Sequence, residues 1–245
     1  LGREVEVRLL TLMLRDEENV GTILSEAEQA AIWAALNELR YLFRHALVRD
    51  AAYKMQLRAR RQALHKLAVE ALETVYAADL SPHFGELAYH AEQAQLTDKA
   101  RDYLHKAGDV AREAYQNNEA LDYYGRALVL TPPEDDQTRY ELLLAQEKIY
   151  NWQGKRPEQE ALLKTLTDLA NQTQDKQKQA EILLRQARHA EEIGNYPAEI
   201  AAAQKAIVFA EELNHKKFIA DALSCWGTAL QWQGNSAEAT TNISK

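Results

Sequence analysis

Three glycines at a constant spacing constrain the fold of this 245-residue chain more than any other feature. Gly154, Gly194 and Gly234 lie 40 residues apart, and Trp152-Gln153-Gly154 recurs as Trp232-Gln233-Gly234. An amphipathic run precedes each glycine and a second one follows it, which is the pattern of a helix, a tight turn and a returning helix. Glycine suits such a turn because it reaches positive φ without a steric penalty. The sequence therefore predicts helical-hairpin repeats.

The composition favours helices along the whole chain. Only 9 Gly and 5 Pro are present and 46% of the residues are hydrophobic. Ala, Leu, Glu, Gln and Arg, which lose little rotamer freedom in a helix, fill most windows. We therefore predict an all-α fold with more than about 70% helix, in which each repeat buries its apolar stripe against its neighbours.

One segment, residues 102–132, resembles the tetratricopeptide repeat. Gly108, Ala120, Tyr124, Ala127 and Pro132 stand at positions 8, 20, 24, 27 and 32 of that pattern. Small residues at the first, second and fourth of these positions let two antiparallel helices approach closely, and the proline ends the second helix. The resemblance implies a tetratricopeptide-like superhelix, and its pattern concerns packing and not catalysis.

The later repeats depart from the pattern. Glu147 takes position 8, and Gln159 and Glu199 take position 20. Their period of 40 residues also exceeds the usual period of about 34, so we expect longer helices or linkers and a looser register of helix pairing. We assign residues 79–245 to the repeat array. The chain ends at Lys245 in what reads as an unfinished helix, and we expect it to be a piece of a longer protein.

Residues 1–78 have no glycine-centred repeat and read as a separate, mostly helical segment. Helical stretches are expected at about Glu4 to Leu14, Glu26 to Leu39, Arg44 to Lys54 and Arg58 to Val75. A short apolar run at 41–43 fits either one strand or a junction between helices.

Around that run, the chain resembles bacterial signal-transduction ATPases with numerous domains. The phrases from Tyr41 to Tyr53 and from Arg60 to His65 resemble the segment that joins the ATPase module to the helical repeats, and residues 87–108 resemble the start of those repeats. The resemblance implies a sensor arm that relays binding to an upstream nucleotide-binding domain of the same chain, with ATP or ADP and Mg²⁺ in the parent protein. It also implies that His45 contacts ADP phosphate; the alternative is a histidine at a helix start, hydrogen-bonded to backbone.

In those relatives the segment completes a winged-helix domain, and the hairpin called the wing precedes the Phe-Arg-His phrase. Here the residues from Leu36 to Arg40 run almost straight into Tyr41. Because this leaves little room for a hairpin, we expect a degenerate, mostly helical winged-helix-like segment.

No motif for catalysis or metal binding accompanies these segments. The loop G-x-x-x-x-G-K-[ST] is absent, and the only Gly-Lys pair, Gly154-Lys155, lacks the earlier glycine. Cys225 is the single cysteine and reads as a core residue, since free cysteine is usually buried. Glu86 and His90, four residues apart, supply too few ligands for a zinc site. We predict no catalytic centre, metal site or cofactor in this chain.

Basic residues cluster between positions 40 and 66, where eight Lys or Arg accompany one acidic residue. The local charge is about +7, although the whole chain carries -8. This asymmetry favours docking against an acidic surface or near nucleotide phosphates, whereas a solvated helix face is the usual reading of such a run. DNA binding is a third alternative, made less favourable by the expected lack of a wing. The predicted docking residues are Arg40, Arg44, Arg49, Arg58, Arg60 and Arg61.

The first helix of each repeat presents a set of polar residues where tetratricopeptide superhelices line their inner surface. Two tryptophans belong to this set; they suit a binding groove, or else they cover the seam between repeats. The predicted groove residues are His105, Asp109, Arg112, Lys148, Asn151, Trp152, Arg188, Glu191, Thr228, Gln231 and Trp232.

Charge, hydropathy and cysteine content indicate which classes of partner and which cellular location to expect. The net charge of -8 disfavours nucleic acid, no apolar run reaches the length of a membrane span, and a single cysteine agrees with a cytoplasmic protein. We expect a protein or peptide partner, or a small-molecule ligand. Three hypotheses follow: the sensor arm of a signalling ATPase, a free-standing scaffold for protein interactions, and an enzyme subunit that uses buried carboxylates.

The missing phosphate-binding loop gives a first prediction. The purified chain should neither bind ATP tightly nor hydrolyse it, because no backbone cradle for the phosphates is present. Isothermal titration and a phosphate-release assay would measure both properties. Turnover that a substitution within these residues abolishes would contradict the prediction.

Overall fold

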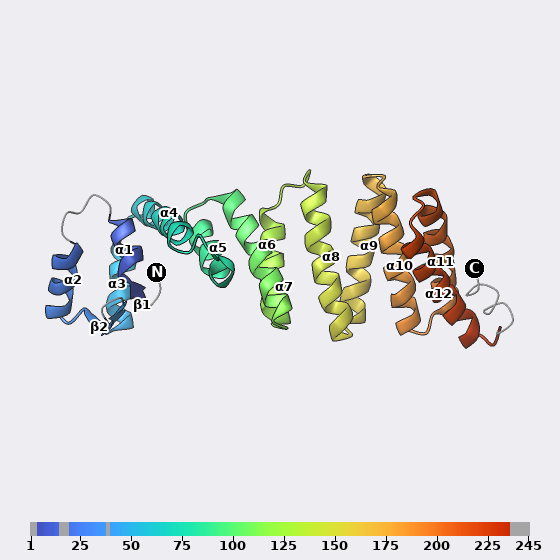
Figure 1. The fold of residues 1–245 in the computed structure, drawn as a ribbon, viewed down its shortest axis with the longest axis horizontal. Coiled ribbons are helices and arrows are strands. Elements are labelled where there is room, and N and C mark those ends of the chain that lie inside the picture. The colour runs from blue at the N-terminus through green and yellow to red at the C-terminus, as the bar shows by residue number, and fades with distance from the viewer. Residues whose placement is uncertain (1–3, 15–19, 38–39, 236–245) are drawn as a thin grey trace. The chain divides into compact units, whose positions relative to one another are not determined.

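The structure is a computed structural model that describes residues 4–14, 20–37 and 40–235, and it divides into two compact units, residues 1–130 and 131–245. Helices account for 78% of the described residues, which confirms the all-α prediction. Figure 1 shows the helices following one another in chain order within each unit. None of the described helices is long and apolar enough to cross a membrane. The predicted boundary after residue 78 lies inside the first unit and stays a prediction.

The first unit begins with a small antiparallel sheet and four helices. The strands are β1 (Glu4–Glu6), β2 (Trp33–Asn37) and β3 (Arg40–Phe43), with β3 in the middle. Val5 lies opposite Tyr41, and Trp33 lies opposite Phe43. The helices of this part are α1 (Val7–Met13), α2 (Val20–Gln29), α3 (Ala46–Met55) and α4 (Arg58–Val75).

The hairpin β2-β3 corrects two of our expectations. The helix predicted for Glu26 to Leu39 ends at Gln29. The wing-like hairpin that seemed to lack room is present, and its second strand ends on the phenylalanine of the Phe-Arg-His phrase. Only residues 38 and 39, outside the described part, connect the two strands, and two residues suffice for a hairpin. Cross-strand aromatic packing, with the Trp33 and Phe43 ring centroids 5.3 Å apart, outweighs the helix propensity of the Ala-rich run.

The same unit continues with the first repeat helices. A short 3₁₀ turn (Ser81–His83) leads into α5 (Phe84–Gln93), α6 (Thr97–Glu113) and α7 (Asn117–Leu130). Gly108 lies against the buried ring of Tyr124, where an added Cβ would approach Cε1 to 2.6 Å. Ala120 and Ala127 are also fully buried. The small residues therefore permit the close helix approach expected from the repeat pattern.

Up to residue 235, where its described part ends, the second unit contains five helices of 17 or 18 residues, as the longer repeat period predicts. They are α8 (Asp136–Gln153), α9 (Arg156–Gln172), α10 (Lys176–Glu192), α11 (Tyr196–Glu212) and α12 (Lys216–Trp232). Gly154, Gly194 and Gly234 have φ values of 67°, 70° and 85°. The three glycines occupy the left-handed turns for which they were predicted. Asp135 and Asp175 cap the starts of α8 and α10 with their carboxylates.

Polar residues that replace the small ones of the pattern are paired in one repeat and unpaired in the next. Gln159 Nε2 donates to Glu147 Oε1 at 2.7 Å, and Arg185 Nη1 donates to Glu147 Oε2 at 2.7 Å. Forty residues further on, Ala187 stands in place of the first carboxylate, and both carboxylate oxygens of Glu199 are buried without a hydrogen-bond partner among the described residues. Burial, aided by Glu191, raises the pKa of Glu199 to about 7.

This difference predicts that replacing glutamate by glutamine has opposite effects on stability at Glu199 and at Glu147. Because the pKa of Glu199 is raised in the folded chain, the unfolded chain loses this proton at a lower pH. The free energy of unfolding therefore falls as pH rises from about 4.5 to about 7. Glu199→Gln should therefore be close to neutral near about pH 4 and stabilise by up to about 3 kcal/mol at about pH 8. Urea unfolding followed by circular dichroism would measure this.

Glu147→Gln is the matched control, since that carboxylate is equally buried but paired with Arg185. It should destabilise by about 1 to 3 kcal/mol at about pH 8. Equal effects of the two substitutions at that pH would contradict this account of the two repeats.

Candidate functional site

Eight of the predicted groove residues recur at equivalent positions on three helices of the second unit. The helices α8, α10 and α12 are the first helices of successive repeats, so residues 40 apart occupy the same helical position. We name this set the repeat face; its members are Lys148, Asn151, Trp152, Arg188, Glu191, Thr228, Gln231 and Trp232.

The two tryptophans of the repeat face are exposed. Trp152 and Trp232 each have 68% of their surface accessible, which disfavours the alternative that they cover a seam between repeats. Trp226, also on α12, is the half-buried one: it packs against the core cluster of Ala187, Ala203 and Cys225. Exposed indoles at equivalent repeat positions are a costly arrangement in water unless a partner covers them.

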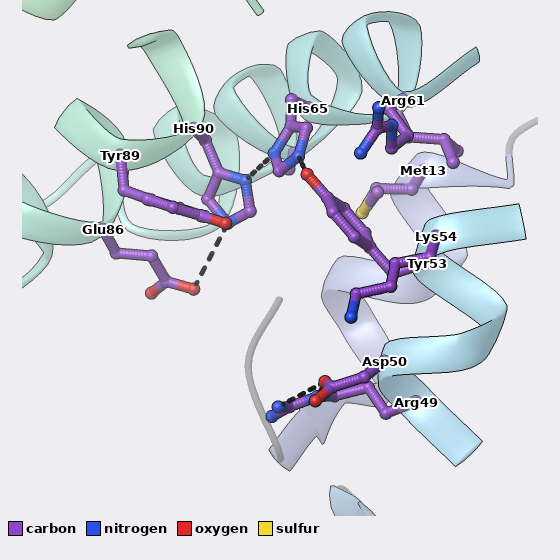
Figure 2. Close-up of a pocket in the computed structure, with 12 residues that line it drawn as sticks. Met13, Arg49, Asp50, Tyr53, Lys54, Arg61, His65, Glu86, Tyr89 and His90 are labelled. Carbon is purple, nitrogen blue, oxygen red and sulfur yellow. Dashed lines mark hydrogen bonds and ion pairs between the residues drawn. The ribbon is translucent and has the colours of Figure 1, made fainter. Parts of the chain in front are cut away.

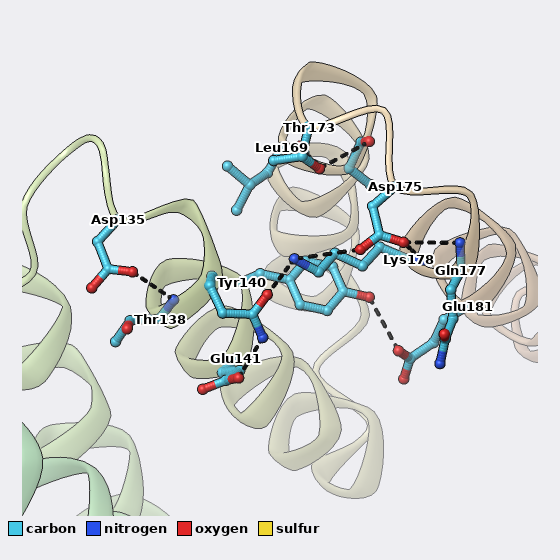
Figure 3. A network of polar contacts seen from close by, with 12 residues as sticks. Asp135, Thr138, Tyr140, Glu141, Leu169, Thr173, Asp175, Gln177, Lys178 and Glu181 are labelled. Atoms are coloured by element: carbon cyan, nitrogen blue, oxygen red, sulfur yellow. Dashed lines mark hydrogen bonds and ion pairs between the residues drawn. The ribbon is translucent and has the colours of Figure 1, made fainter.

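Hydrogen bonds and ion pairs hold the helices of this face in register. At one end, Tyr140 Oη donates to Glu181 Oε2 at 3.1 Å, and Lys178 Nζ donates to Gln137 Oε1 at 2.6 Å, so α8 is joined to α10 (Figure 3). At the end that carries Trp152, Arg156 donates to Asn151 Oδ1 at 2.8 Å and to Glu192 at 2.7 Å.

The charges on the face are mixed. Arg188 lies 3.6 Å from Asp221 of α12, whereas Glu191 lies one turn further along α10 and is exposed. The face thus presents both signs of charge between its two indoles, together with the amides of Asn151 and Gln231.

The other three predicted groove residues lie on α6 in the first unit and contact one another. Asp109 accepts a hydrogen bond from Tyr124 Oη at 2.7 Å, and it lies 3.2 Å from Arg112 and 3.8 Å from His105. Their polar groups are occupied within the unit, and a role for them in ligand binding stays a prediction.

The predicted nucleotide contact, His45, is exposed at the residue that precedes α3. It stands at a helix start, as the alternative reading proposed, but its side chain makes no capping hydrogen bond there. Its contact with a nucleotide in a parent protein stays a prediction.

The predicted docking residues divide among three elements and one connecting residue. Arg40 lies on β3, 3.8 Å from Glu6, and Arg44 follows that strand. Arg49 of α3 donates to Asp50 at 2.7 Å. Three remain on α4: Arg58, Arg60 and Arg61. Among the described residues, Arg49 and Arg61 line one pocket, and Arg58 and Arg61 line a smaller one beside it. The larger of the two is the candidate site.

That site is a pocket of about 770 Å³ in the first unit. Residues of α1, α3, α4 and α5 line it, and Figure 2 shows their side chains converging from these helices. The lining residues are Met13, Arg49, Asp50, Tyr53, Lys54, Arg61, Leu64, His65, Ala68, Glu86, Tyr89 and His90. We name it the α3-α5 pocket.

A chain of polar contacts crosses one wall of the α3-α5 pocket. Tyr53 Oη lies 2.9 Å from His65 Nε2, His65 Nδ1 lies 2.7 Å from His90 Nδ1, and His90 Nε2 lies 3.8 Å from Glu86 Oε1. One proton arrangement satisfies all three contacts: the tyrosine donates to His65, His65 donates through Nδ1 to His90, and His90 directs its Nε2 proton to the carboxylate. Both imidazoles are then neutral.

Burial enforces this neutral state. Desolvation, with a smaller contribution from His90, lowers the pKa of His65 to about 4, and desolvation also lowers the pKa of His90. In the sequence, Glu86 and His90 alone offer too few ligands for a zinc site, and His65 is only one residue of the phrase from Arg60 to His65. The positions of both histidines on the apolar stripes of α4 and α5, beside Ala68 and Leu87, were the available indication.

Comparison with known proteins identifies the fold of the chain but assigns it to no family. No protein-family model matches the chain, and no curated protein matches it in sequence. Among solved structures, the apo form of RapI has a TM-score of 0.62 at 11% identity, over 80% of this chain and 55% of that one. This chain therefore spans about half of the RapI chain.

Two further structures agree. BtubC (BKLC) from P. vanneervenii has a TM-score of 0.59 at 10% identity, over 98% of this chain and 89% of that one. A putative kinesin light chain of Podosopora anserina, described as having nearly identical TPR-like repeats, has a TM-score of 0.52 at 16% identity. The match covers 82% of this chain and 94% of that one. At these identities the likeness establishes a tetratricopeptide-like helical-repeat fold.

The buried histidine pair makes stability depend on pH. Because the pKa of His65 is lowered, protonation favours the unfolded chain, so stability is complete above about pH 6.5 and is lost as pH falls through about 4. The loss should approach about 3 kcal/mol, measured by urea unfolding across that range. His65→Leu should flatten this dependence, whereas His105→Leu, outside the pair, should retain it; an unchanged slope in the first variant would contradict the assignment.

Proposed function

We propose that this chain is a non-catalytic, partner-binding sensor arm of a larger cytoplasmic signalling ATPase. The repeat face binds a segment of protein or peptide, and the part before the repeats relays that binding to an upstream nucleotide-binding domain. ATP or ADP with Mg²⁺ belongs to that upstream domain in the parent protein.

The repeat face carries the binding part of this proposal. Trp152 and Trp232 are large, exposed and positioned by rigid helices, and tryptophan is the residue most enriched among those that dominate binding energy. The amides of Asn151 and Gln231 offer donors and acceptors to a peptide backbone. Lys148, Arg188 and Glu191 supply both signs of charge, which select a partner sequence more than they add affinity.

The hairpin before the Phe-Arg-His phrase supports the link to an ATPase. In the family that the chain resembles, a wing occupies this place, and the hairpin β2-β3 ends at Phe43, directly before Arg44 and His45. A free-standing scaffold, the alternative, has no need of a wing-like sheet joined to its first repeats. The observation therefore favours the sensor arm.

Relay of binding requires two states with different partner affinity. A partner shifts an existing equilibrium only by its differential affinity for the two states. His45, exposed at the residue before α3, is the residue we assign to the nucleotide side of that equilibrium, and the repeat face forms the other side.

Selection from a random peptide library displayed on phage tests the binding role. Peptides selected on the chain should bind it saturably, and Trp152→Ala and Trp232→Ala should each weaken binding at least about tenfold, because each removes an exposed aromatic anchor. Val208→Ala on α11, which also truncates an exposed apolar side chain in the same unit, should leave binding unchanged. Peptides that bind both tryptophan variants as tightly as the wild type would contradict the proposal.

A further inference from the structure

The walls of the α3-α5 pocket have a distinct chemical character. Apolar surface comes from Met13, Leu64 and Ala68. Tyr53 and Tyr89 also line the pocket, and 38% and 47% of their respective surfaces are exposed. Its volume of about 770 Å³ falls in the range of small-molecule sites, which are mostly apolar with a few placed polar groups.

Two cations beside these walls have no anionic partner among the residues that the structure describes. Lys54 is exposed and makes no ion pair with any residue that the structure describes. Arg61 holds its guanidinium 5.2 Å from the centre of the Tyr53 ring and likewise has no carboxylate partner in the described part of the chain. Arg49, by contrast, is neutralised by Asp50 at 2.7 Å.

The charge of the lining follows from these contacts. Arg49, Lys54 and Arg61 are positive, Asp50 and Glu86 are negative, and both histidines are neutral, which leaves one net positive charge. The histidine chain does not offer a free donor, because its protons are used between Tyr53, His65, His90 and Glu86. A ligand would therefore meet an apolar and aromatic wall and two cations, Lys54 and Arg61, that have no carboxylate partner in the described part of the chain.

We propose that the α3-α5 pocket binds a small organic monoanion with an aromatic or similarly flat apolar body, such as an aromatic carboxylate or sulfonate. The body lies against the tyrosine rings and the apolar wall, and Lys54 and Arg61 hold the anionic group. This site is separate from the repeat face and does not depend on the function proposed for it.

A pair of fluorescent probes that differ only in charge tests this directly. 8-Anilinonaphthalene-1-sulfonate and N-phenyl-1-naphthylamine share one aromatic body, and only the first carries a sulfonate. The sulfonate should bind the chain at one saturable site, at least about fivefold more tightly than the neutral probe, and its binding should weaken as salt rises. Non-fluorescent 2-naphthoate should displace it.

Substitutions then locate the site. Lys54→Gln and Arg61→Gln should each weaken sulfonate binding about three- to fivefold and leave binding of the neutral probe unchanged. Lys106→Gln is the matched control, because that lysine also lies near aromatic rings of the same unit, at 5.8 Å from the Phe84 ring, but outside the pocket. Leu64→Trp should block both probes by filling the pocket, with circular dichroism to confirm folding.

Three results would overturn the proposal. Equal affinity for the two probes would remove the role of the cations, and wild-type sulfonate binding in both glutamine variants would place the site elsewhere. Binding without saturation would indicate general apolar surface. If the tryptophan variant fails to fold, the two glutamine variants still decide the outcome.

Discussion

Close approach of antiparallel helices is the constraint on which the rest of the structure depends. Each repeat helix buries its apolar stripe only against neighbouring helices, so the distance between helix axes fixes how much surface leaves water. At the first repeat this distance is set by Gly108, whose missing Cβ makes room for the ring of Tyr124. In the second unit Glu147 and Gln159 meet the same constraint with a buried hydrogen bond. The Glu199 carboxylate is buried as well, but no described residue hydrogen-bonds to it.

The regular stacking also determines what faces solvent. Because α8, α10 and α12 begin 40 residues apart, side chains at equivalent positions are presented together, and the polar contacts between α8 and α10 hold that presentation (Figure 3). The first unit solves a different problem. Its helices α3, α4 and α5 are joined through a buried histidine pair, and they leave a pocket beside it that the repeat pattern does not produce.

The sequence predicted the parts of the fold that carry a local pattern. Gly154, Gly194 and Gly234 marked three turns correctly, and α4 has the predicted bounds of Arg58 and Val75. Other turns adopt the same left-handed backbone at Gln95, Tyr115, Gln174 and Asn214, and these carry no glycine to reveal them. The hairpin was missed because its stability comes from cross-strand aromatic contacts. The His65–His90 contact was missed because it joins residues 25 positions apart.

The indole resonances of the four tryptophans provide the most direct measurement of the central claim, that the repeat face binds the partner. With ¹⁵N-labelled chain, addition of a selected peptide should shift the Nε1 resonances of Trp152 and Trp232, which are exposed on that face. Those of Trp33, in the sheet of the first unit, and Trp226, packed against the core of the second, should stay in place. Shifts confined to Trp33 or Trp226, with the other two unchanged, would contradict the account.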